Sequence, residues 1–177
     1  MTLVFCSFYH SFRSLFVAIA LLSVTIGCGD SNDNDTPTVA QLTTLEGNWK
    51  VNALKTDPKV LGFDDLVPVY TVMYGTCIND ITFSFKAGGA VGYDNPASCA
   101  SSAVSVATIS AATGIDANST WSQSGNTLVI TTSKGAKTTY TTTFGTSTAQ
   151  LKWQGAYDFT MSGTQTNYNL TLELRKL

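Results

Sequence analysis

Several features are scarce in this chain of 177 residues, and each shortage argues against a class of function. Charged side chains make up only 12% of the residues, and the lysines and arginines form no stripe, which argues against nucleic-acid binding. Histidine occurs once, at His10. His10 lies in an N-terminal leader, predicted below, that is removed from the mature chain. No histidine then remains for a Ser-His-Asp or Cys-His catalytic set, or for a histidine-containing zinc or haem site. We therefore expect no enzyme, no cofactor and no metal site.

Apolar runs long enough to span a bilayer are missing after residue 27. Before it, Arg13 precedes the short apolar run 15–22, the arrangement of a secretory signal peptide. A membrane-spanning helix is the alternative, which the short run and the Gly-Cys-Gly-Asp break after it disfavour. The stretch Thr25-Ile26-Gly27-Cys28 resembles the processing box of bacterial lipoproteins, in which the cysteine receives acyl chains such as palmitate. We predict a signal peptide over residues 1–27 and a membrane anchor at Cys28.

Residues 28–41 contain three aspartates and no apolar periodicity, so they cannot build a core. We predict a flexible acidic tether between the membrane and the domain. Aspartate-rich runs after the lipidated cysteine resemble a surface-export signal of some Gram-negative lipoproteins, and a plain linker is the alternative. The expected location is the outer membrane of a Gram-negative envelope, on its periplasmic face or its surface. The sequence does not indicate an oligomeric state.

The domain predicted over residues 42–177 consists of short alternating segments separated by Gly, Asn or Ser. Alternation of apolar and polar residues is typical of strands with one buried face. We predict a loop or helical turn over 55–66 and a strand over 68–74, whereas 101–118 fits a strand pair, a helix or an insertion. Eight to ten strands at hairpin spacing favour an all-β fold, either an antiparallel up-and-down β-barrel or a sandwich.

The order of the motifs resembles that of bacterial lipocalin-like lipoprotein domains. The first motif is Leu-x-Gly-x-Trp (45–49), followed by a cysteine before an aromatic strand and by a glycine turn. A second cysteine and Gly-Asn-Thr-Leu (125–128) come next, and the last strand has leucine at alternate positions. The resemblance implies a lipocalin-like barrel and no particular reaction. It also implies a structural anchor of Gly47 and Trp49 on the first strand, with Arg175 of the last strand packed over Trp49.

Two cysteines remain for the domain, because Cys6 lies in the leader and Cys28 is assigned to lipid. In an oxidising compartment an even pair predicts a disulfide between Cys77 and Cys99. A thiol nucleophile is the alternative, and it lacks a partner base.

Aromatic residues on the alternating strands leave two functions open. The first is non-catalytic binding of a small apolar or amphipathic molecule in a hollow barrel. The second is a filled barrel that contacts another envelope protein or an extracellular polymer. The residues that either line a cavity or fill it are Tyr70, Tyr74, Phe83, Phe85, Tyr93, Trp121, Tyr140 and Trp153.

Overall fold

The computed structural model describes residues 42–100, 106–160 and 162–177. The predicted signal peptide, Cys28 and the whole of the predicted tether lie outside these residues. Within the described part no helix has the length and apolar character needed to cross a membrane. The strands are β1 (Gly47–Val60), β2 (Phe63–Asp65), β3 (Thr82–Phe85), β4 (Ala90–Tyr93), β5 (Ser119–Ser124), β6 (Thr127–Thr131), β7 (Lys137–Phe144), β8 (Thr148–Tyr157) and β9 (Thr166–Lys176). The helices are α1 (Leu66–Tyr74), α2 (Cys77–Asp80), α3 (Val106–Thr113) and a 3-10 turn, η1 (Ala97–Cys99).

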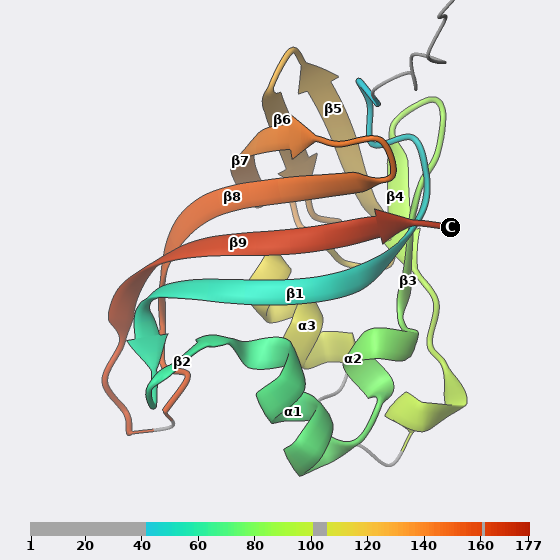
Figure 1. Ribbon diagram of the computed structural model, residues 1–177. Coiled ribbons are helices and arrows are strands. Elements are labelled where there is room, and N and C mark those ends of the chain that lie inside the picture. Colours follow the sequence, from blue (N-terminus) through green and yellow to red (C-terminus); the bar gives the residue numbers. More distant parts are fainter. Residues whose placement is uncertain (1–41, 101–105, 161) are drawn as a thin grey trace, which may run out of the picture. The chain divides into compact units, whose positions relative to one another are not determined.

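Eight of the strands close into an antiparallel up-and-down barrel (Figure 1). Each strand from β3 to β9 pairs with the next, and β1 pairs with both β3 and β9. The short β2 adds to β1 outside this ring. The predicted all-β barrel is therefore confirmed, and the sandwich is excluded because the first and last strands pair directly.

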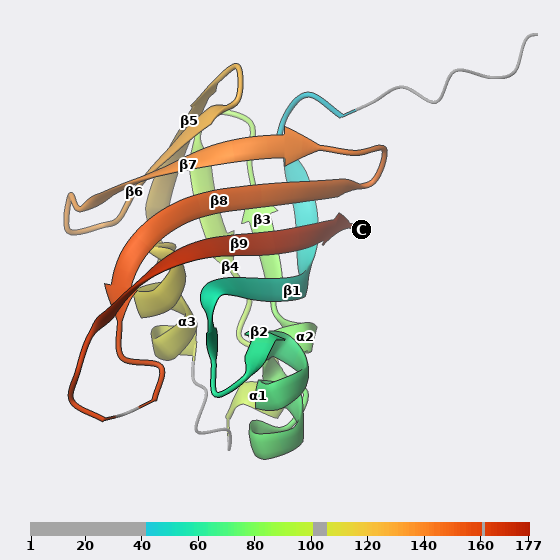
Figure 2. The ribbon, with the colours of Figure 1, turned by 60° about the vertical axis from the view of Figure 1, so that its left-hand side comes forward.

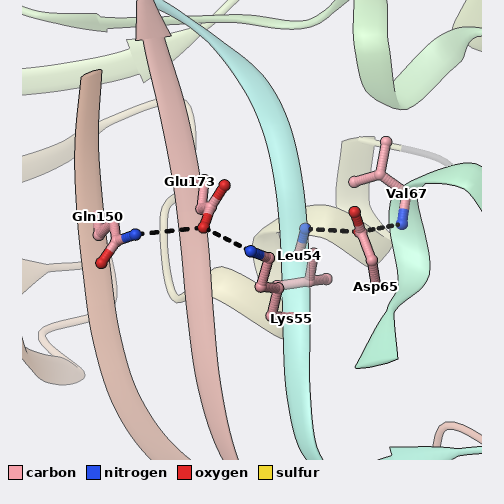
Figure 3. Close-up of polar contacts among 6 residues, drawn as sticks. All are labelled: Leu54, Lys55, Asp65, Val67, Gln150 and Glu173. Atoms are coloured by element: carbon pink, nitrogen blue, oxygen red, sulfur yellow. Dashed lines mark hydrogen bonds and ion pairs between the residues drawn. The ribbon is translucent and has the colours of Figure 1, made fainter. Parts of the chain in front are cut away.

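The seam between β1 and β9 carries an ion pair on the outer face of the barrel. Lys55 Nζ lies 2.9 Å from Glu173 Oε1, and Gln150 Nε2 of β8 donates to the same oxygen at 3.2 Å (Figure 3). The hydrogen bond to Glu173, together with its charge, raises the pKa of Lys55. These side chains tie three neighbouring strands together where the barrel closes. Lys55 is half exposed, so the pair contributes little to the free energy of unfolding.

Two local predictions were wrong. Residues 68–74 belong to helix α1 and not to a strand, and most of 55–66 continues β1 and forms β2. Helix α1 begins there because the Asp65 side chain accepts a hydrogen bond from Val67 N, and Pro68 falls in the first turn, where a missing N–H is tolerated. For residues 101–118 the sequence left a strand pair, a helix or an insertion open, and residues 106–113 of this segment form helix α3.

The two ends of the barrel differ. At one end, which we call the hairpin end, lie the β3–β4, β5–β6 and β7–β8 turns, and the segment before β1 crosses them: Leu42 N donates to Gly145 O and Gln123 Nε2 donates to Thr43 O. At the other, the helix-covered end, lie α1, α2 and α3 (Figures 1 and 2). The predicted disulfide is confirmed there, since Cys77 of α2 is bonded to Cys99 of η1. It joins the β1–β3 and β4–β5 connections, which supply all three helices.

Candidate functional site

Trp49 lies at the hairpin end and is completely buried. Its indole Nε1 donates to Leu45 O at 2.6 Å, and Lys176 Nζ lies 5.6 Å from the centre of the ring. The predicted packing of Arg175 over Trp49 is wrong. Side chains alternate along a strand, and Trp49 pairs with Lys176, so Lys176 lies on the inner face and Arg175 is exposed on the outer one.

Gly47 allows this arrangement. Its φ is +124°, and a Cβ at this position would lie 3.0 Å from Lys176 Cε. A side chain there would both strain the backbone and displace the lysine from the tryptophan ring. The interior of the barrel at the hairpin end is therefore filled by a structural cluster.

A cavity of about 140 Å³ lies at the helix-covered end. Strands β1, β3 and β9 form its floor, and the helices and the β8–β9 loop form its walls. Apolar side chains predominate in the lining, which favours an apolar occupant. The lining residues are Val51, Leu54, Tyr70, Ile78, Phe83, Thr108, Ile109, Ala112, Thr113, Asp158, Phe159 and Leu172.

The eight aromatic residues singled out in the sequence do not form one site. Tyr70 and Phe83 line the cavity, and Tyr74 packs against Tyr70 with ring centres 5.9 Å apart. Tyr93 and Trp121 border separate depressions of the surface. The remaining three are buried in the core and fill the barrel: Phe85, Tyr140 and Trp153.

Asp65 fixes one wall of the cavity against its floor. Its Oδ1 accepts from Leu54 N of β1 at 3.1 Å and from Val67 N of α1 at 3.0 Å (Figure 3). Leu54 lines the cavity directly, and α1 carries Tyr70, which lines it from the side. One carboxylate thus caps the helix and sets its distance from the strand.

Helix α3 is held by hydroxyl groups from the barrel wall. Tyr140 donates to Thr113 O, and Tyr157 donates to Ala112 O at 3.0 Å. Trp153 Nε1 donates in turn to the Tyr157 hydroxyl at 2.9 Å. The last carbonyls of a helix lack partners within it, and these tyrosines supply them. Burial raises the pKa of Tyr140, so its hydroxyl stays protonated and can donate. Two of the aromatics expected to line a cavity therefore position one of its walls.

Asp158 is the charged residue of the lining. Its carboxylate accepts from Gly163 N at 2.7 Å, Ser162 N at 3.0 Å and Thr160 Oγ1 at 3.2 Å, all within the β8–β9 loop. Partial burial acts to raise the pKa of this carboxyl group, but the hydrogen bonds outweigh it and hold the pKa below its ordinary value. The described residues contain no group of three His, Cys, Asp or Glu side chains arranged to hold a metal ion.

Sequence reasoning missed the cavity residues of α3 and of the β8–β9 loop. Helix α3 consists of small residues with a weak apolar pattern, and its role comes from the barrel that surrounds it. The loop offered one local signal: an aspartate followed by Thr160, Ser162 and Gly163 is typical of a turn organised around a carboxylate.

Closed barrels of about eight strands either are filled by side chains or have room for one small ligand, and this barrel has an apolar cavity under its helices. The family model for a lipocalin-like domain matches residues 45–153, which is more than half of the chain, and the chain belongs to this family. The match ends within β8, and the structure adds β9, which closes the barrel. No curated protein and no solved structure matched the chain.

Proposed function

We propose that this protein binds one small apolar molecule in the cavity at the helix-covered end and catalyses no reaction on it. The observation that carries the proposal is the apolar cavity of about 140 Å³. An engineered protein cavity of about 150 Å³, lined by Leu, Ile and Phe, stays dry and binds benzene or xenon. The cavity is therefore sized for a molecule of about one six-membered ring, and probes with several fused rings are too large.

The size of the cavity also limits the affinity. An aromatic ring buries on the order of 200 Å² of apolar surface, worth roughly 5 kcal/mol at about 25 cal/mol per Å². Association itself has an entropic cost that reduces this value. We expect a dissociation constant on the order of 1 mM, or somewhat below it, for a simple ring compound. Binding should therefore be measured by NMR and not by assays that need tight complexes.

A pair of variants of α3 tests the site. Ala112 lines the cavity, and its exposed neighbour Ala111 does not. Ala112→Phe should fill the cavity and abolish the shifts that fluorobenzene causes in the methyl resonances of Ile109 and Leu172. Ala111→Phe makes the same substitution on the same helix and should leave the shifts unchanged. If fluorobenzene shifts neither methyl group in the parent protein, the cavity does not bind such ligands and the proposal is wrong.

The predicted signal peptide and lipidation site at the N-terminus support binding at the outer membrane. Lipidation at Cys28 would anchor the chain to the outer membrane, and the acidic residues 28–41 would hold the barrel away from it. Poorly soluble molecules concentrate at membranes, so an anchored carrier would meet its ligand there. More than one acyl chain is needed for such an anchor to be stable.

The second candidate function, contact with another envelope protein or an extracellular polymer, has its own support. The hairpin end of the barrel is filled, and α1 exposes Val72 by 89% and Met73 by 62%. Exposed apolar side chains that lie together favour a partner surface. Failure of every ring-sized probe in the NMR titration would favour this function over ligand binding.

A further inference from the structure

The lining of the cavity carries a negative charge and no positive one. Asp158 is the only lining side chain that is ionised at neutral pH, and no Lys, Arg or His belongs to the lining that the structure describes. Burial raises the pKa of Tyr70, the other titratable residue of the lining, so its hydroxyl is uncharged. Lysines of β1 and β9 are engaged elsewhere: Lys50 donates to Asp80 O, Lys55 pairs with Glu173 on the outer face, and Lys176 covers Trp49 at the hairpin end.

The carboxylate of Asp158 is also fixed in place. Four donor groups of its own loop, from Thr160, Ser162 and Gly163, hold its two oxygens. Because these contacts also lower its pKa, the carboxylate keeps its negative charge over the neutral range. A ligand in the cavity therefore meets a permanent negative charge in a lining that contains no cation.

We infer, on the basis of the function proposed above, that the cavity selects uncharged ring-sized ligands and rejects carboxylates of the same size. A ligand carboxylate would lose water without gaining a cation in exchange, and the uncharged hydroxyl groups of the lining do not neutralise its charge. It would also be repelled by Asp158 across a partly buried space, where the repulsion is stronger than in water. Both effects act in the same direction. The ligand class is thus a neutral monocyclic or similarly small apolar compound, and fatty-acid anions are excluded by charge as well as by size.

The test compares benzamide with benzoate, which have nearly the same shape and differ in charge. The strands and the core of the described structure all lie within residues 42–177, so this part of the chain is used without lipid or detergent. Fluorobenzene serves as the neutral reference, and the methyl resonances of Ile109 and Leu172 report binding. Benzoate should bind on the order of tenfold more weakly than benzamide, or worse. Equal affinities for benzamide and benzoate would overturn the inference while leaving the fluorobenzene result intact.

Substitutions then assign the effect to Asp158. Asp158→Asn should bring the affinity for benzoate close to that for benzamide, with both ligands measured on the same variant. Asp116→Asn is the matched control, because Asp116 also accepts hydrogen bonds from its own turn, from Asn118 and Ser119, and does not line the cavity. It should leave the benzamide-to-benzoate ratio unchanged.

Ionic strength provides a check that needs no substitution. Added salt screens the charge of Asp158 and should bring the ratio of the benzamide affinity to the benzoate affinity closer to one in the parent protein. A ratio that changes neither with salt nor in Asp158→Asn would show that the carboxylate is not responsible. Absence of fluorobenzene binding would refute the binding function itself, and the inference with it.

Discussion

Replacement of Trp49 by alanine should be among the most destabilising single changes in the barrel. The side chain is 0% exposed, and removal of a large buried aromatic residue costs about 3–5 kcal/mol. The indole hydrogen bond to Leu45 O and the contact with Lys176 are also lost, which places Trp49 in the upper part of that range. We therefore expect Trp49→Ala to lower the free energy of unfolding by about 4–5 kcal/mol, near the upper end of the range for such residues.

The measurement is urea denaturation of residues 42–177 with the disulfide intact, followed by far-UV circular dichroism. Trp121→Ala is the matched control, because Trp121 is only half buried, and we expect a loss of about 2 kcal/mol for it. Trp49→Phe separates packing from hydrogen bonding, because it keeps an aromatic ring in the core but removes the indole N–H. The buried Leu45 carbonyl then loses its donor, at a cost of about 1–3 kcal/mol. The reasoning is refuted if Trp49→Ala is no less stable than Trp121→Ala.

The other predictions concern the helix-covered end and the anchor. Replacing Cys77 and Cys99 together by serine should cost about 3 kcal/mol, because their bond closes a loop with a sequence separation of 22 residues; a double variant as stable as the parent in urea would contradict this. Asp65→Ala removes the acceptor for two backbone N–H groups and should cost about 1–2 kcal/mol, whereas Asp65→Asn, which keeps an oxygen, should cost less. Tyr140→Phe should cost about 1–3 kcal/mol, because the Thr113 carbonyl loses its buried donor; thermal unfolding would show this. Cys28→Ser should release the protein from the membrane fraction or leave the precursor uncleaved, and a processed, membrane-bound serine form would disprove lipidation.

The sequence alone was enough to predict an all-β fold and the disulfide, and the family resemblance pointed to the barrel over the sandwich. Strict alternation, as in Leu170, Leu172 and Leu174 of β9, requires only that one face of a strand be buried, and this is a local property. The pairing of Cys77 with Cys99 followed by elimination, since no other cysteine was left in the domain. The family resemblance was likewise carried by short motifs that can be read without coordinates.

The helices were harder to predict because their causes are not local. Residues 68–74 are mostly β-branched or aromatic, which favours a strand, but the Asp65 cap and the packing of α1 against the barrel favour a helix. Helix α3 has almost no pattern of its own, and hydroxyl groups of Tyr140 and Tyr157 hold it in place. Its position depends on residues far away along the chain.

The location of the cavity was decided by tertiary structure alone. Alternation identifies the inward-facing side chains, but it does not show which level of the barrel is filled and which is hollow. Phe85, Tyr140 and Trp153 fill the barrel, whereas Phe83 borders the cavity, although all four face inward. The register between β1 and β9 likewise placed Lys176, and not Arg175, over the tryptophan. Both outcomes depend on how distant strands align when the sheet closes, and that alignment is set by the packing of the whole core.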